Sequence, residues 1–401
     1  MGFSAVILAV GLLVGLLLPG SSSASVIISA PNPSTHDYKV AVAHFPLVDI
    51  TRKDVYAATE DRKLMVSLFM PVHKSVCMTE CEKAYMPPDT ARVSNAQFFE
   101  HSDAGVFEQM AYMACCGGNT ESINASKYPV VILEPQVGTS RLLYTTLARF
   151  MSANGVAVVL VDHPHDSSIV EFMKARDKPT IYNNGTIPLS PFEAMKSWNA
   201  TITQAMETRT QDINFVLQQL TTLALPDRFP GLNFTSALNT QSYAIVGHGL
   251  GGTVATTLNV LDPRVRLSIN LSGTAPLLQH PSAAQIYFFG RAAFTRDDDI
   301  HWPTTWPYLT GRATEFDLKD AGIFDYSDLP WLVDFARKEG GMPDLVNARG
   351  LGSLGPWGFH AMACFVEGVL RVEFLADWTA VSRCFGFFQQ MVPYALQRGG
   401  A

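Results

Sequence analysis

From residue 128 onward, the chain alternates short, continuously apolar segments with longer amphipathic ones. The apolar segments predict buried strands, at Tyr128–Leu133, Val156–Val161, Tyr243–Val246, Leu267–Leu271, Gln285–Phe289 and Thr314–Leu318. The amphipathic segments predict helices at Arg141–Asn154 and Ala200–Leu223, a helix that follows the strand Tyr243–Val246 and ends at Val260, and a helix from about Phe359 to Trp378. Continuous apolar strands separated by helices are typical of a parallel sheet covered on both faces. The pattern therefore predicts an α/β fold with a mostly parallel sheet and helices on both faces.

The earlier part of the chain follows different patterns. Lys39–Asp49 and Lys63–Val72 alternate apolar and polar residues and are rich in β-branched ones, which predicts a hairpin. Residues 74–127 read as irregular and hold four of the cysteines, so we expect an excursion tied down by disulfides rather than a domain. Residues 167–198 are polar and contain prolines, which predicts a loop or lid. We therefore expect one domain over residues 25–401.

The N-terminus carries an apolar stretch, Ala5–Leu18, followed by proline, glycine and serines. It is shorter than the roughly 20 residues that a membrane span needs. A secretory signal peptide over residues 1–24 is the interpretation that fits best, with an uncleaved anchor as the alternative. No later segment reads as membrane-spanning.

Cysteine count and glycosylation sequons agree with export. The six cysteines are an even number that an oxidising compartment would pair, in one of fifteen possible ways, although scattered buried thiols are the alternative. Sequons predict glycosylation at Asn124, Asn184, Asn199 and Asn233, whereas Asn270 falls in a predicted core strand. The net charge of −7, spread over 401 residues, argues against a nucleic-acid partner. The sequence therefore predicts a secreted, disulfide-bonded glycoprotein.

The most informative segment is a glycine-rich turn at residues 243–252, which read YAIVGHGLGG. It matches the G-x-S-x-G frame of a nucleophile elbow, with Gly249 in the serine position. It also satisfies G-x-G-x-x-G, the dinucleotide-binding fingerprint. That fingerprint asks for an acidic residue at the end of the next strand, which here ends in Asn270-Leu271-Ser272. The elbow interpretation is therefore preferred, and no cofactor is expected.

Further segments support the elbow interpretation because they match one known family in the same order along the chain. They are Arg62–Val72, Tyr85–Ala91, Val130–Tyr144, Val161–Phe172, Gly247–Gly252, Ile269–Thr274 and Tyr326–Pro330. On these segments the chain resembles a secreted fungal-type member of the platelet-activating-factor acetylhydrolase family, which has the α/β-hydrolase fold. The resemblance spans most of the mature chain.

The resemblance implies where a catalytic triad would lie. An acyl hydrolase of this kind needs a nucleophile, an acid and a histidine base, in that chain order. Carried over, these positions are Gly249, Ser272 and Ile323, so all three are replaced. The resemblance also places an oxyanion loop at residues 134–138, where the backbone amides of Val137 and Leu250 are the candidate donors. Gln136 stands there in place of a glycine.

Other residues offer alternative chemistry. His248 and Ser272 form a candidate relocated dyad, and His248 is also a candidate for the pocket rim. His163 and His165 lie in the segment DHPHD, where they are candidates for the pocket rim or, as an alternative, for metal ligands. Aromatic residues at 302–308 line an acyl pocket in one interpretation and pack in the core in the other.

We therefore expect a pseudo-esterase that keeps a pocket for a lipid or small ester without triad catalysis, with contact to a membrane surface or lipoprotein as a further expectation. The alternatives are an active carboxylic-ester hydrolase, similar to a 1-alkyl-2-acetylglycerophosphocholine esterase, that uses other residues, and a metal-assisted hydrolase.

Overall fold

The computed structural model describes residues 25–401 except 32–33, 101–104, 173–180, 183–185, 344, 346 and 398–401. The predicted signal peptide, residues 1–24, and the sequon residue Asn184 lie outside the described part.

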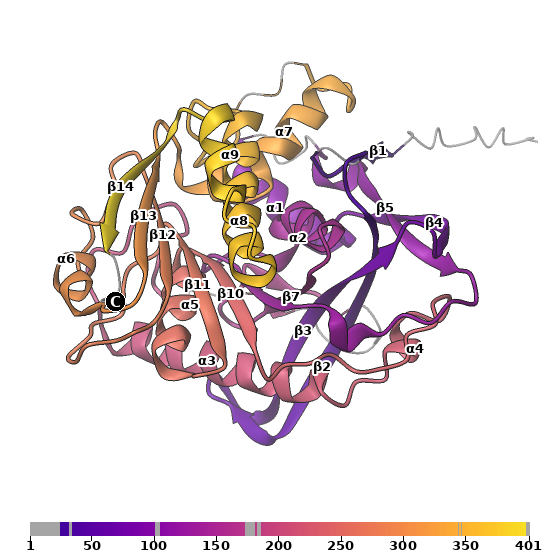
Figure 1. The fold of residues 1–401 in the computed structure, drawn as a ribbon, viewed down its shortest axis with the longest axis horizontal. Coiled ribbons are helices and arrows are strands. Elements are labelled where there is room, and N and C mark those ends of the chain that lie inside the picture. The colour runs from indigo at the N-terminus through magenta and orange to yellow at the C-terminus, as the bar shows by residue number, and fades with distance from the viewer. Residues whose placement is uncertain are drawn as a thin grey trace, which may run out of the picture.

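The core of the molecule is a nine-stranded sheet with the order β14-β13-β12-β11-β10-β6-β7-β3-β2. The strands from β7 to β13 are parallel, whereas β3 pairs antiparallel with β7 and β14 antiparallel with β13. The predicted hairpin is confirmed as β2 paired with β3 (Figure 1). The bounds are β2 Tyr38–Asp54, β3 Ala57–His73, β6 Val130–Glu134, β7 Ala157–Asp162, β10 Tyr243–His248, β11 Val265–Leu271, β12 Ile286–Arg291, β13 Ala313–Leu318 and β14 Met391–Gln397.

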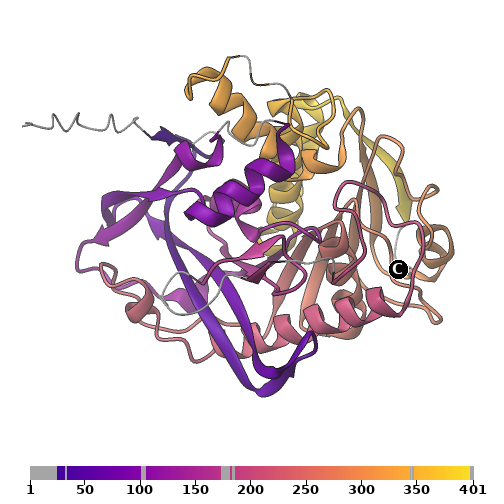
Figure 2. The same cartoon turned by 180° about the vertical axis from the view of Figure 1, so that it is seen from behind.

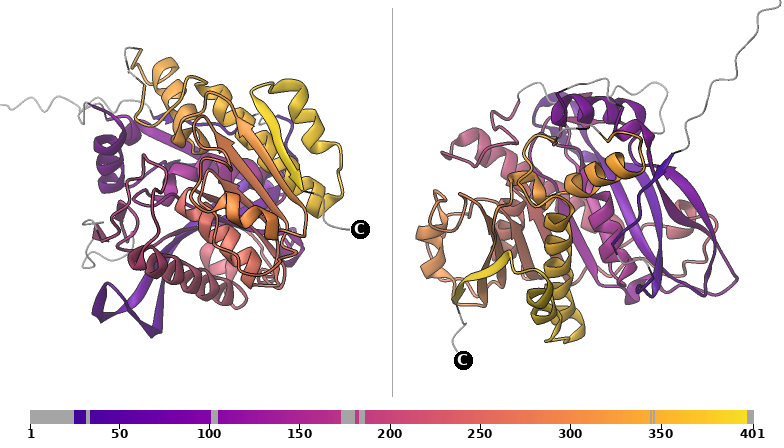
Figure 3. Two further views of the ribbon diagram at one scale, coloured as in Figure 1. Left: turned by 90° about the vertical axis from the view of Figure 1, so that its left-hand side faces the viewer. Right: turned by 90° about the horizontal axis from the view of Figure 1, so that it is seen from above.

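Helices cover both faces of this sheet, as the alternating pattern predicts. On one face the apolar side chains of α2, α7 and α8 pack with the sheet in one core cluster, and on the other those of α3 and α5 form a second. Figure 2 shows α3 along the lower border of the molecule, and Figure 3 shows the C-terminal helices together on one side of the sheet. The bounds are α1 Pro88–Phe98, α2 Thr145–Ala153, α3 Ala200–Leu220, α4 Leu225–Arg228, α5 Leu250–Leu261, α6 Trp302–Thr305, α7 Leu329–Lys338, α8 Pro356–Leu375 and α9 Ala380–Phe387. Short 3-10 turns span Phe107–Gln109, Ala125–Lys127, Arg141–Tyr144, Trp306–Tyr308 and Ile323–Tyr326.

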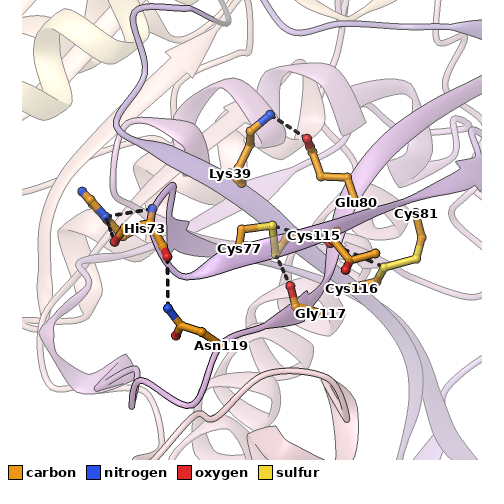
Figure 4. The surroundings of a disulfide bond; sticks show 11 residues. Lys39, His73, Cys77, Glu80, Cys81, Cys115, Cys116, Gly117 and Asn119 are labelled. Carbon is orange, nitrogen blue, oxygen red and sulfur yellow. Dashed lines mark hydrogen bonds and ion pairs between the residues drawn. A yellow bond between two sulfur atoms is a disulfide. The ribbon is translucent and has the colours of Figure 1, made fainter.

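Residues 74–127 are more regular than the sequence suggested. β4 (Cys77–Ala84) and β5 (Met110–Gly118) pair antiparallel, and β1 (Val26–Ile27) adds a parallel strand beside β5. Disulfides join Cys77 to Cys115 and Cys81 to Cys116 across the two longer strands (Figure 4). The expectation of irregular structure was wrong because β4 is almost wholly exposed, so it lacks the apolar run by which a strand is recognised.

A third disulfide, Cys364–Cys384, joins α8 to α9. All six cysteines are therefore paired, and the alternative of scattered thiols is wrong. Within the predicted loop 167–198, β8 (Ile169–Val170) and β9 (Ile181–Tyr182) form a small hairpin. Among the residues that the structure describes, no helix is both long and apolar enough to cross a membrane.

The sequon asparagines differ in exposure. Asn124, Asn199 and Asn233 are exposed, and the Asn199 side chain caps the start of α3. Asn270 is fully buried in β11, and its amide bonds Thr256 Oγ1 and the Gly273 N–H. Burial of this residue agrees with its exclusion as a glycosylation site.

Candidate ligand-binding site

The glycine-rich turn joins β10 to α5 in the geometry of a nucleophile elbow. Gly249 has φ 54° and ψ −119°, a left-handed conformation that favours glycine. Its N–H donates to the Leu271 carbonyl at 2.9 Å, which ties the turn to the end of β11. Gly247 and Gly251 are in close approach, since a Cβ on Gly247 would lie 2.1 Å from the Gly251 carbonyl oxygen. The turn is therefore complete, although it carries no hydroxyl.

The three positions that the resemblance assigns to a triad meet at this turn. Gly249, Ser272 and Ile323 all line one small cavity, with a volume of about 30 Å³. The other walls come from the oxyanion loop, from the start of α5 and from residues 189–195 of the predicted lid. The full lining is Gln136, Val137, Leu189, Ser190, Glu193, Ala194, Met195, Gly249, Leu250, Thr253, Ser272, Gly273, Thr274, Phe294 and Ile323.

A glutamine side chain accepts from both candidate oxyanion donors. The backbone N–H groups of Val137 and Leu250 donate to Gln136 Oε1 at 2.9 and 2.8 Å. Gln136 Nε2 donates in turn to the Pro191 carbonyl at 3.2 Å, in the lid segment. A Cβ added to Gly249 would lie 2.1 Å from Gln136 Oε1. The Val137 and Leu250 N–H groups thus converge on an acceptor from the chain itself.

The loop that carries Gln136 is held from several sides. The Gln136 N–H donates to Tyr144 Oη at 3.1 Å, and Thr139 Oγ1 donates to the Gln136 carbonyl at 2.7 Å. Arg209 Nη1 donates to the Pro135 carbonyl at 2.7 Å, and the Gly138 N–H to the Asp166 carbonyl at 2.9 Å. These bonds fix the backbone, so only the glutamine side chain can leave the amides without unfolding the loop.

Ser272, at the position where the resemblance implies the acid, sits in a second tight turn. It is a non-glycine residue with φ 59°, and its Oγ accepts a hydrogen bond from Arg291 Nε at 2.9 Å. The following carbonyl, of Gly273, accepts from Trp302 Nε1 at 2.9 Å. Trp302 is fully buried and packs against Phe288, and Trp306 is almost fully buried. Both tryptophans are therefore core residues, and Trp302 supports the Ser272 turn through its bond to Gly273.

His248, expected at the pocket rim, lies beneath the elbow and does not line the cavity. Its Nδ1 is 2.8 Å from Tyr144 Oη, and its ring packs edge-on against Phe324. Burial, together with the charge of Arg291, lowers the pKa of His248 to about 3, so the ring is neutral. Because Ser272 bonds Arg291 and His248 bonds Tyr144, the structure does not support the His248–Ser272 dyad.

His163 is also buried rather than at the rim. Its Nδ1 lies 2.8 Å from Asp212 and its Nε2 lies 3.0 Å from Glu134. Burial alone would lower its pKa, but the charge of Glu134 and the hydrogen bonds to Asp212 and Glu134 raise the pKa of His163 to about 9. His163 is thus an imidazolium that bridges two carboxylates.

This bridge belongs to a larger buried ion network between the sheet and α3. Four cations and four carboxylates take part, namely Arg52, Arg62, His163 and Arg209 with Asp54, Glu134, Asp166 and Asp212. Removing one partner from such a network leaves a buried charge uncompensated. The DHPHD segment is therefore explained by ion pairing.

His165 has φ 71° and lies 3.9 Å from Asp54, away from the cavity lining. Within the described residues, no group of histidines, cysteines and carboxylates has the arrangement of a metal site. The metal-assisted alternative therefore has no site in this part of the chain.

The segments Tyr85–Ala91 and Tyr326–Pro330, which match the family, meet at a buried carboxylate. Asp328 accepts from Tyr85 Oη at 2.5 Å and from the Thr146 and Leu147 N–H groups at the start of α2, at 2.6 and 2.9 Å. Burial raises the pKa of Asp328 to about 7. Both segments are thus structural supports of the face opposite α3.

Sequence reasoning missed two residues of the site. Gln136 was noted only as a departure from glycine, and Arg291 was not singled out. The single signal in the sequence was the position of Gln136 next to Val137 in the oxyanion loop. No local pattern marks Arg291, which reaches Ser272 because β12 lies beside β11.

Comparison with known proteins gives a consistent family. Residues 53–278 match the family model described as platelet-activating factor acetylhydrolase, isoform II. A protein of Arthroderma benhamiae named "Probable 1-alkyl-2-acetylglycerophosphocholine esterase" is 27% identical over 328 residues, which are 76% of this chain and 77% of the relative. Among solved structures, a ferulic acid esterase from Streptomyces cinnamoneus matches with a TM-score of 0.65 and 19% identity, over 93% of this chain and 99% of the other. The fold is the α/β-hydrolase fold.

Proposed function

We propose that this chain, which belongs to the platelet-activating factor acetylhydrolase isoform II family, binds a small lipid- or ester-derived ligand without cleaving it. One observation carries the proposal. Gln136 Oε1 accepts from the amides of both Val137 and Leu250 and occupies the space that a side chain at position 249 would need. An esterase requires these donors for the developing oxyanion and an attacking hydroxyl beside them.

The replaced acid and base positions support the same conclusion. Ser272 accepts from a guanidinium rather than orienting a histidine, and Ile323 has no group that takes a proton. Loss of triad members costs on the order of 10⁴–10⁶ in rate in a working hydrolase. Loss of all three, with the oxyanion donors also occupied, leaves no acyl-transfer machinery at the elbow.

The alternative is an active carboxylic-ester hydrolase that uses other residues, and the name of the Arthroderma benhamiae relative favours it. The full chain should be assayed with 4-nitrophenyl acetate and with 1-alkyl-2-acetylglycerophosphocholine, and treated with a fluorophosphonate. We expect no labelling and no turnover above that of the Ser272→Ala variant. Turnover in the wild type that disappears in Ser272→Ala would establish the alternative.

Rebuilding the triad tests whether the nucleophile, acid and base positions are assigned correctly. The full variant carries four substitutions: Gln136→Gly, Gly249→Ser, Ser272→Asp and Ile323→His. The variant with the last three changes alone should stay inactive, because the Gln136 side chain that the new serine displaces still crowds the cavity beside the two amides. Activity that appears only when Gln136→Gly is added would support the assignment. Full activity in the three-residue variant would overturn it.

Secretion is part of the proposal, supported by the N-terminal apolar stretch, the three disulfides and the exposed Asn124, Asn199 and Asn233. Expression of the full chain in eukaryotic cells should place it in the medium, with a mass that falls on treatment with peptide N-glycosidase. Retention of an unglycosylated chain inside the cells would contradict it.

Contact with a membrane surface or lipoprotein is supported by three exposed aromatic side chains on and beside the C-terminal helices. Trp357, Trp378 and Phe387 are 62%, 64% and 77% exposed. Sedimentation with phosphatidylcholine vesicles should carry the wild type down more than a variant with serine at these three positions. Equal recovery of both would refute this part.

A further inference from the structure

A surface groove separate from the elbow cavity lies between α3 and α5, on the face of the sheet opposite α8. Figure 2 shows α3 along the outer border of the molecule. The groove has a volume of about 420 Å³, which is within the range of ligand sites. Two of its lining residues, Leu261 and Leu277, are exposed leucines. Apolar side chains that gather in one exposed groove indicate that another group covers them.

The groove combines an apolar floor with a polar rim. Trp198 and Met206 join the two leucines in the floor, whereas Thr210 and Thr257 bring hydroxyl groups and Glu207 brings the one carboxylate of the lining. A sugar ring has the same two characters, because its C–H faces pack on aromatic and aliphatic side chains while its hydroxyl groups form hydrogen bonds. A hydrocarbon chain would leave the polar rim without a hydrogen-bonding partner. The lining therefore favours a carbohydrate.

The sequon Asn199-Ala200-Thr201 stands at one end of this groove. Asn199 is exposed, and its Oδ1 accepts from the Ile202 N–H at 3.0 Å, which caps α3. That hydrogen bond uses the oxygen of the amide and not its nitrogen. A glycan attached to Asn199 Nδ2 therefore leaves the helix cap intact.

Hydrogen bonds connect Asn199 to the lining of the groove. The Thr203 N–H and Oγ1 donate to the Asn199 carbonyl at 3.1 and 3.2 Å, and Thr203 Oγ1 accepts from Trp198 Nε1 at 2.8 Å. The Trp198 ring in turn packs against His301, with ring centres 5.1 Å apart. Because Thr203, Trp198 and His301 all line the groove, the glycan attachment point adjoins it directly.

We propose that the N-linked glycan of Asn199 folds back into this groove and covers Trp198, Leu261 and Leu277. Its first sugar residues lie with their C–H faces on the apolar floor and their hydroxyl groups toward the rim. Attachment forms a C–N bond to Nδ2, which loses one proton, while the C–O bond to the lipid diphosphate of the oligosaccharide donor breaks. This inference rests on the glycosylation that forms part of the proposed function.

The test is a comparison of melting temperatures, followed by circular dichroism, for full chains secreted from eukaryotic cells. Mass analysis of the peptide that contains residue 199 first establishes the glycan. Leu277→Ser should lower the melting temperature by about 1–2 °C, because the serine loses the contact with the sugar. In the Thr201→Ala background, which removes the sequon but keeps the Asn199 cap, Leu277→Ser should have no measurable effect.

Leu375→Ser is the matched control for this comparison. Leu375 is 57% exposed and Leu277 is 58% exposed, but Leu375 lies outside the groove. Its substitution should have the same effect with and without the sequon. Where Thr201→Ala is not secreted, peptide N-glycosidase treatment of the wild type and Leu277→Ser gives the same comparison, since the aspartate left at position 199 also caps a helix.

Equal effects of Leu277→Ser in both backgrounds, with Asn199 glycosylated, would overturn the inference and leave the proposed function standing. A secreted chain with glycans at Asn124 and Asn233 but none at Asn199 would overturn it as well. A dimer of the wild type that Leu277→Ser dissociates, seen by light scattering, would assign the groove to a second copy of the chain and also refute the inference. A chain without any glycan would contradict the proposed glycosylation together with it.

Discussion

The contact between positions 136 and 249 gives the sharpest test of the site. Replacing Gly249 with serine puts a Cβ 2.1 Å from Gln136 Oε1, so the glutamine must leave the Val137 and Leu250 amides. An unpaired buried donor costs about 1–3 kcal/mol, and the left-handed conformation adds about 1–2 kcal/mol for a residue with a Cβ. Gly249→Ser should therefore lower the free energy of unfolding by about 3 kcal/mol or more.

The chain offers a matched control for the backbone part of this cost. Gly355 has φ 57° and ψ −141°, close to the values of Gly249, and an added Cβ would meet nothing within 4 Å. Gly355→Ser should therefore cost only the conformational part, about 1–2 kcal/mol. The difference between the two serine variants isolates the displacement of Gln136.

The decisive measurement is a double-mutant cycle, with unfolding by guanidinium chloride followed by tryptophan fluorescence. Gln136→Gly alone should cost about 2 kcal/mol, because two amides lose their acceptor and water replaces it only in part. In the Gly249→Ser background the same change should cost almost nothing, since the glutamine has already been displaced. We expect a coupling of about 2 kcal/mol between positions 136 and 249, and none beyond about 0.5 kcal/mol between 136 and 355. Additive effects at 136 and 249 would show that Gln136 does not occupy the site.

Three further predictions concern stability. The pKa of His163 is raised from 6.5 to about 9, so the stability that its charge contributes is complete below pH 6.5 and is lost as the pH rises to about 9. Over this pH range the free energy of unfolding should fall by up to about 3 kcal/mol more in the wild type than in His163→Gln. Parallel pH profiles of the two proteins would contradict this prediction. Replacing Cys364 and Cys384 with alanine removes a disulfide that joins residues 20 positions apart, and should lower the free energy of unfolding by about 3 kcal/mol. An unchanged melting temperature would refute this prediction. Trp302→Phe removes the indole bond to the turn after Ser272 and should cost about 1–3 kcal/mol by denaturant unfolding, whereas Trp357→Phe at an exposed position should cost little, and equal effects would count against a supporting role.

The sequence predicted the sheet well because its strands are buried on both faces. Val130–Glu134 and Ala157–Asp162 are entirely buried, and such strands appear as unbroken apolar runs. The turn at Gly249 was predictable for a different reason, because close backbone contacts at Gly247 and Gly251 leave room only for glycine. The exposed strand Cys77–Ala84 gave no such signal.

The chemistry of the site was less predictable because it depends on side-chain directions. His163 and His165 are two residues apart, yet one is buried between two carboxylates and the other lies near Asp54. Gln136 is adjacent to Val137 in sequence, but only its rotamer places Oε1 on the two amides. Long-range contacts of this kind leave no periodic pattern in a chain.

The paired disulfides between β4 and β5 have a consequence for how this part of the chain reaches its native state. Cys115 and Cys116 are neighbours, and successive side chains of a strand point to opposite sides of a sheet. Cys115 is buried in the core beneath the ribbon, whereas Cys116 is only partly covered. The disulfides to Cys77 and Cys81 therefore join β4 and β5 on both sides of this two-stranded ribbon (Figure 4). A shift of the strand register by one residue would turn each sulfur away from its partner. Both disulfides can therefore form only when β4 and β5 are paired in the correct register.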